Sequence, residues 1–118
     1  MELSRAVDLD QLVTSIRESG NISCADWLAH QRVAASVWDA SIEKLGIDLL
    51  ELPLDTSVRQ LSYGNVVKLA VLAAMAERPS AISTAYEFVG FDMATLDAVR
   101  LFIWASCKDR DFAIVLKR

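Results

Sequence analysis

The sequence predicts an all-α protein, a compact bundle of five to six helices around a central apolar helix at about 65–77, with room for a short C-terminal strand. Three observations predict this class. Apolar residues recur mostly at three- and four-residue intervals. Four glycines and two prolines are too few for a turn-dense β-sandwich. The segment at 65–77 is apolar on nearly every side. The length of 118 residues favours one helical domain over 1–118.

The first two helices are predicted from capping residues and apolar spacing. Residues 4–19 form an amphipathic helix that either fills this range or starts only at Asp8, and the glycine that follows ends it. The Ser23 hydroxyl can cap the next helix. Because an apolar stripe then continues as far as Gly46, we expect the longest helix of the protein at about 24–45.

The middle of the chain is predicted as a connector followed by the central helix. Pro53 holds the residue before it in an extended conformation, so 47–54 should be one helical turn and then a connector. A short helix through Leu61 comes next. Lys68 is the only charge within the central apolar helix, which indicates a core element. At about 12 residues it is too short to cross a bilayer, which takes about 20.

Two helices and an apolar tail are predicted for the rest of the chain. Capping residues and apolar spacing place the helices at about 80–89 and 92–107, joined as an αα-hairpin. The tail at 112–116 is too short for periodicity to decide its structure. It can form a last helical turn, pair as a strand with the connector at 49–54, or pair with a second molecule.

Composition and charge exclude several classes of protein. The chain is 53% apolar and 24% charged, which excludes general disorder. A formal charge of −4 argues against nucleic acid and anionic membranes as partners. The N-terminal residues do not resemble a signal peptide. Cys24 and Cys107 fit two buried thiols in a reducing cytoplasm.

The sequence contains no pattern typical of a catalytic, metal or cofactor site. His30 is the only histidine, and along a helix it would lie about 9 Å from Cys24. One histidine and two scattered cysteines match no metal-ligand spacing. The glycines are isolated, so no glycine-rich phosphate loop is present in these residues. We therefore expect a protein that is not an enzyme and that holds no cofactor and no metal.

A run of acidic residues is the candidate binding surface. Two interpretations are open: a solvated polar face, or a docking surface for a basic partner. The predicted partner-binding residues are Asp39, Glu43, Asp48, Glu51 and Asp55.

A small acidic domain without catalytic residues favours a function in protein binding. The most concrete form is a bacterial immunity-type or inhibitor protein in the cytoplasm that neutralises a basic toxin or nuclease. The alternative is a helix-turn-helix-like transcriptional regulator using residues 80–107, although its second helix carries few cations. We expect a protein partner, no nucleic acid and no membrane, with a homodimer through the tail as a further option.

Overall fold

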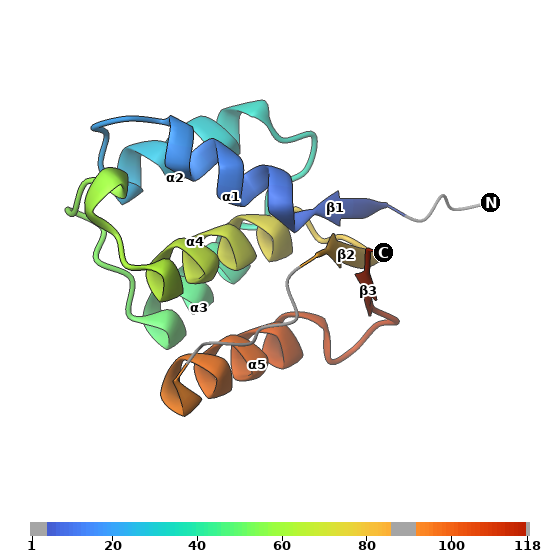
Figure 1. Cartoon of the computed structure of the whole chain (residues 1–118). Coiled ribbons are helices and arrows are strands. Elements are labelled where there is room, and N and C mark those ends of the chain that lie inside the picture. Colours follow the sequence, from blue (N-terminus) through green and yellow to red (C-terminus); the bar gives the residue numbers. More distant parts are fainter. Residues whose placement is uncertain (1–4, 86–91, 118) are drawn as a thin grey trace.

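The computed structural model describes residues 5–85 and 92–117. Within these residues, five α-helices and a 3-10 helix are combined with three β-strands. The helices fill one side of the molecule and the strands gather at the other (Figure 1). In chain order the elements are β1 (Ala6–Asp8), α1 (Leu9–Glu18), α2 (Cys24–Ala34), α3 (Ala40–Leu50), the 3-10 helix η1 (Val58–Gln60), α4 (Tyr63–Ala76), β2 (Ala81–Thr84), α5 (Met93–Cys107) and β3 (Ala113–Leu116).

The three strands form one parallel sheet in the order β1-β2-β3. Ile82 in the middle strand pairs with Val7 of β1 on one side and with Ile114 of β3 on the other. Helix α5 connects β2 to β3, as a parallel pair requires a long crossover. The prediction of an all-α bundle is therefore wrong, and the fold is mixed α/β. Strands of three or four residues are too short to show the alternating pattern by which a strand is found in a sequence.

Helix α4 occupies the centre of the structure, as the apolar segment predicted. From Val66 to Ala76, every residue except Lys68 is buried. Helices α1, α3 and α5 pack against it (Figure 1). Ser62 caps its first turn, because the Ser62 hydroxyl accepts a hydrogen bond from the Asn65 amide. Among the described residues, no helix has the length and apolar character needed to cross a membrane.

The long helix expected at 24–45 is two helices, α2 and α3, separated by residues 35–39. Asp39 ends the connector and caps α3 by accepting hydrogen bonds from the amides of Ser41 and Ile42. The Asp39 amide donates to the Ala76 carbonyl at 2.7 Å, which fixes the connector to the end of α4. The spacing of apolar residues continues across the break because both helices bury a face against the same core. Periodicity alone could not show the break.

Two predicted helices are partly strands. Residues 6–8, inside the helix expected at 4–19, form β1, and the alternative start is confirmed because Asp8 is the N-cap of α1. Residues 81–84, expected in the helix at 80–89, form β2, in which Ile82 and Thr84 are buried. The remainder of that expected helix and the turn of the αα-hairpin fall on 86–91, outside the described residues.

The other short segments also differ from expectation. The tail is a strand, but its partner is β2 and not the connector at 49–54. The short helix expected before Leu61 is only the 3-10 turn η1. Gly46 does not end a helix: it lies buried inside α3, where the helix comes very close to its neighbours. A Cβ atom at Gly46 would be 2.8 Å from Cδ1 of Leu72 in α4 and 2.9 Å from Cε1 of Phe102 in α5.

This close approach predicts the effect of adding one methyl group. Gly46→Ala should lower the free energy of unfolding by about 1–3 kcal/mol, because α3 has to move away from α4 and α5. Gly64→Ala is the matched control, since its new Cβ would meet Thr95 at an ordinary 3.5 Å. It should be neutral or stabilising by up to about 1 kcal/mol. Urea denaturation of both variants measures the difference, and equal stabilities would contradict this account of α3.

Candidate functional site

The carboxyl ends of the three parallel strands meet at one edge of the sheet, where ligands bind in open α/β sheets. Asp8 ends β1, Thr84 ends β2 and Lys117 directly follows β3. Asp10, in the first turn of α1, joins them. We call these four residues the carboxyl-edge cluster. It brings together three segments that are far apart in the sequence.

Lys117 forms the centre of this cluster. Its ammonium group lies 2.7 Å from Oδ1 of Asp8 and 3.2 Å from Oδ2 of Asp10. The same Oδ1 of Asp8 accepts the Asp10 amide at 3.0 Å and so also caps α1. Lys117 is the last residue that the structure describes. It therefore connects the end of β3 to the end of β1 and the start of α1. Both carboxylates favour the charged ammonium, so the pKa of Lys117 is raised, first through its hydrogen bond to Asp8.

Asp10 is held by three donors. The buried Thr84 hydroxyl donates to its Oδ1 at 2.8 Å, and the Ala85 amide donates to its Oδ2 at 2.9 Å. Burial by itself raises the pKa of Asp10, but the hydrogen bonds from Ala85, Thr84 and Lys117 outweigh it and leave the pKa below its ordinary value. The Asp10 carboxylate thus links α1 to the end of β2 in its ionised form.

A cavity of about 530 Å³ opens beside the cluster. This volume is within the range of small-molecule sites, which are lined mainly by apolar side chains. Here most of the lining groups are instead carboxylates, hydroxyls and an amide. Its lining residues are Asp8, Asp10, Gln11, Thr14, Ser15, Glu18, Ser19 and Lys117. Three carboxylates face one lysine, so the cavity repels an anion unless further cations are supplied.

The five acids predicted to bind a partner are not part of this site. Asp39 accepts a hydrogen bond from Nη1 of Arg78 at 2.9 Å. Glu43 accepts from Nε and Nη2 of Arg32, at 3.2 and 2.6 Å, and from the indole of Trp38 at 3.0 Å. These two carboxylates are therefore engaged within the helical part of the protein.

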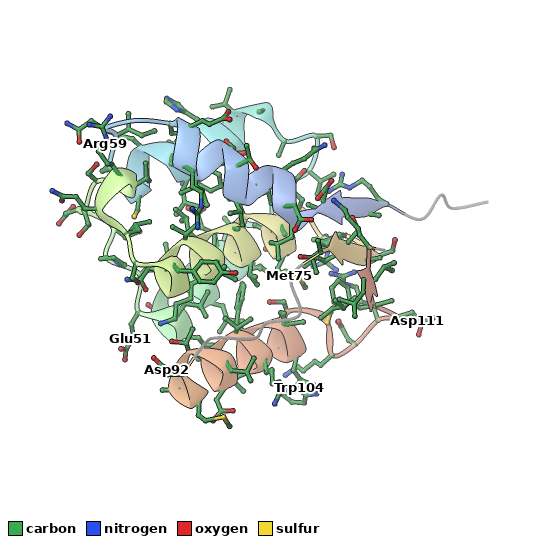
Figure 2. The ribbon with its side chains drawn as sticks, in the orientation of Figure 1. Glu51, Arg59, Met75, Asp92, Trp104 and Asp111 are labelled. Atoms are coloured by element: carbon green, nitrogen blue, oxygen red, sulfur yellow. The ribbon has the colours of Figure 1, made fainter. Side chains whose placement is uncertain are left out.

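The remaining three acids are exposed. Glu51 lies at the end of the molecule opposite the strands (Figure 2), and its backbone is left-handed, with a φ of 51°. Asp48 belongs to the outer face of α3, and Asp55 follows the connector. Nothing in the structure tests a partner-binding role for any of the five, so that role remains a prediction.

The residues considered for catalysis are also dispersed. His30 is exposed on α2. Cys24 and Cys107 are buried free thiols, and burial raises the pKa of each, which makes them unreactive. No group of three or more His, Cys, Asp or Glu residues within the described ranges 5–85 and 92–117 could hold a metal ion.

Sequence reasoning did not identify the carboxyl-edge cluster. Asp8 and Asp10 were interpreted only as acids near the start of a helix, and no role was predicted for Lys117. The available signal was a charged residue directly after a short apolar segment. It occurs twice, as Asp8 after Val7 and as Lys117 after Leu116. That signal has meaning only once the strands are known to be parallel neighbours.

Comparison with known proteins identifies the fold. No protein-family profile and no curated protein sequence matches this chain. An ATP-binding subunit of an ABC transporter is similar in structure over 97% of this chain and 48% of its own, with a TM-score of 0.73 and 13% identity. A putative ABC transporter ATP-binding protein from Pyrococcus furiosus covers 83% of this chain and 50% of its own, with a TM-score of 0.63 and 18% identity.

A third structure gives the same result. A putative cobalt transport ATP-binding protein covers 96% of this chain and 41% of its own, with a TM-score of 0.64 and 16% identity. The chain therefore spans half or less of the length of these structures. At such identities the likeness shows the fold alone. It overturns the prediction of an immunity-type inhibitor and the alternative of a helix-turn-helix regulator, because the neighbours are ATP-binding domains of mixed α/β fold.

The Asp10 carboxylate predicts a pH dependence of stability. A lowered pKa means that the ionised group stabilises the fold at neutral pH, and that this contribution is lost as pH falls through the folded-state pKa. Asp10→Asn should therefore reduce the free energy of unfolding at pH 7, and the difference from wild type should shrink below about pH 4. Denaturant titrations between pH 7 and pH 3 measure it. Asp97→Asn, at an exposed position on α5, is the control and should have little effect.

Proposed function

We propose that this chain is half of an ABC-type ATP-binding domain and that it contributes to nucleotide binding together with residues outside these 118. The observation that carries the proposal is the extent of the likeness: 97% of this chain corresponds to only 48% of an ATP-binding subunit. The parallel sheet with a polar carboxyl edge supports it, since that edge is where α/β folds bind ligands.

The phosphate-binding part of such a site is not in this sequence. Nucleotide phosphates are held by a loop of the form G-x-x-x-x-G-K-[ST], whose amides and lysine cancel their charge. The four glycines of this chain, at positions 20, 46, 64 and 90, are isolated. The cavity beside the carboxyl-edge cluster is acidic. The phosphate contacts therefore have to come from residues outside this sequence.

We infer that the chain alone is not an enzyme. Phosphoryl transfer depends on positioning the phosphates and on cations that neutralise the developing charge. In the described residues the carboxyl edge supplies one cation, Lys117, and two carboxylates already hold it. We expect no ATP hydrolysis by residues 1–118 above the rate in buffer.

The proposal extends to the compartment. Two buried free thiols favour a reducing environment, and we therefore place the protein in the cytoplasm. An ATP-binding domain also needs cytoplasmic ATP.

A chimera tests the nucleotide proposal. The 118 residues replace the matching part of the solved ABC transporter ATP-binding subunit, and the affinity for a fluorescent ATP analogue is measured with magnesium present. We expect the chimera to bind the analogue, whereas the 118-residue chain alone does not. A chimera that folds, as judged by circular dichroism and a cooperative melt, but does not bind would contradict the proposal.

A matched pair of charge reversals locates the nucleotide. Lys117→Glu in the chimera should weaken binding by tenfold or more, about 1.4 kcal/mol, because a carboxylate replaces the cation of the carboxyl edge. Lys108→Glu makes the same change of charge next to Trp104 on α5, away from this edge, and should leave binding unchanged. Equal losses in the two variants would mean that the nucleotide does not face the carboxyl edge.

A further inference from the structure

The outer face of α5 carries large apolar side chains that the described part of the chain leaves uncovered. On the inner face, Val99 and Phe102 are buried where α5 packs against α3 and α4. On the outer face, Met93 is 67% exposed and Trp104 is 62% exposed, and Leu101 beside them is 50% exposed. Trp104 projects from the edge of the molecule, away from the other helices (Figure 2). Uncovered apolar side chains gathered on one face indicate a surface that binds another protein.

Two charged residues stand between Met93 and Trp104 on the same face. Asp97 and Arg100 are both exposed, and the four residues follow one another at intervals of four, three and four. Residues at these intervals lie along one stripe of a helix. We call Met93, Asp97, Arg100 and Trp104 the α5 stripe. Within residues 5–85 and 92–117, no ion pair involves Asp97 or Arg100.

The α5 stripe has the same pattern in both directions. Its ends are apolar, its middle pair has one acid and one base, and its spacing is symmetric. Reversal of the helix exchanges Met93 with Trp104 and Asp97 with Arg100. We propose that a second copy of this chain binds here, with the two α5 helices antiparallel about a two-fold axis at the middle of the stripe. Each Asp97 then lies opposite an Arg100, and each Met93 lies opposite a Trp104.

The symmetry of this pattern identifies a second copy as the partner. A two-fold contact joins a surface to itself, so each group must find its complement in the reversed order of the same residues. The α5 stripe meets this condition, which a surface for a different protein does not have to meet. Parallel helices would place Asp97 against Asp97 and Arg100 against Arg100. Antiparallel helices pair the opposite charges and also align their dipoles favourably.

The side chains at the ends of the stripe suit a contact between two helices. Intervals of four and three residues are the spacing by which neighbouring helices pack side by side. A contact between the Met93 sulfur and the Trp104 indole adds to the burial of apolar surface. The Lys108 ammonium lies 5.5 Å from the centre of the Trp104 ring of its own chain. This cation–π contact holds the ring at the helix surface before a second copy binds.

This surface is separate from the proposed nucleotide site. Helix α5 forms the lower edge of the molecule in Figure 1, and no residue of the stripe belongs to the carboxyl-edge cluster or to a strand. The nucleotide proposal requires residues from outside this chain at the carboxyl edge and assigns none to the outer face of α5. The dimer is therefore an independent inference, and its failure would leave the nucleotide proposal unchanged.

The mass of the protein in solution tests this inference. The contact uses one helix of each copy, which places it at the small end of specific interfaces, about 1,200 Å² or less. We therefore expect a weak dimer. Sedimentation equilibrium of the full chain, over concentrations up to about 1 mM, should shift from 13.0 kDa toward twice that mass. In the dilute samples used for unfolding the chain is a monomer, so Asp97→Asn keeps its use there as a control for stability.

A matched pair of charge reversals tests the contact. Arg100→Asp turns two attractive pairs into repulsive ones and should raise the dissociation constant of the dimer about tenfold. Arg59→Asp makes the same substitution at an exposed position of η1, far from α5 (Figure 2), and should leave the dissociation constant unchanged. Circular dichroism checks that both variants are folded. A monomer at all concentrations, or equal effects of the two variants, would overturn the proposal.

An exchange of charges tests the antiparallel register. Asp97→Arg alone should weaken the dimer as Arg100→Asp does, because each substitution places like charges opposite each other. The double variant with Asp97→Arg and Arg100→Asp has opposite charges across the axis again and should recover the dissociation constant of the unaltered chain. A double variant as weak as the single variants would show that Asp97 and Arg100 of the two copies are not neighbours, and the register would be wrong.

Discussion

The burial of α4 from Val66 to Ala76, with Lys68 as the exception, is the constraint on which the rest of the structure depends. A helix that has no polar face over Val66–Ala76 cannot lie at a surface, so other elements have to cover all of its sides. Helices α1, α3 and α5 provide this cover. The cover is tight where α3 crosses, since Gly46 leaves no space for even one methyl group between Leu72 and Phe102. The apolar burial of α4 is therefore enough to explain why α1, α3 and α5 surround it.

The sheet depends on α4 in a more indirect way. The chain leaves α4 and within a few residues enters β2, the middle strand, so the position of the central helix places the centre of the sheet. Polar contacts then attach the outer parts. Lys117 binds Asp8, which is 109 residues earlier in the chain, and Asp10 holds the end of β2 through Thr84 and Ala85. The same side chains that form the carboxyl edge therefore also keep the three short strands in register.

The sequence was sufficient to predict the long, strongly apolar elements. The central helix and α5, with Asp92 as its cap, were found because burial and capping leave a local pattern over many residues. The strands could not be found in this way, since β1 has three residues and its neighbours four. The break at Asp39 was missed because both helices face one core. The carboxyl-edge cluster was missed because Lys117 and Asp10 become neighbours only through parallel pairing, which no local pattern records.

The helical part and the sheet differ in how fully residues of this chain neutralise their charged groups and cover their apolar side chains. In the helical part, two carboxylates have partners within the chain: Glu43 binds Arg32 and Trp38, and Asp39 binds Arg78. At the sheet, three carboxylates and one lysine line a polar cavity, and the apolar side chains of β3 are about half exposed. An excess of one charge and an uncovered apolar strand are two independent signs of a surface that lacks its partner. Both occur on the sheet, and the chain spans half or less of the length of the ATP-binding structures of similar fold. The helical layer therefore explains why these residues fold, whereas the sheet carries an unbalanced charge and exposed apolar side chains.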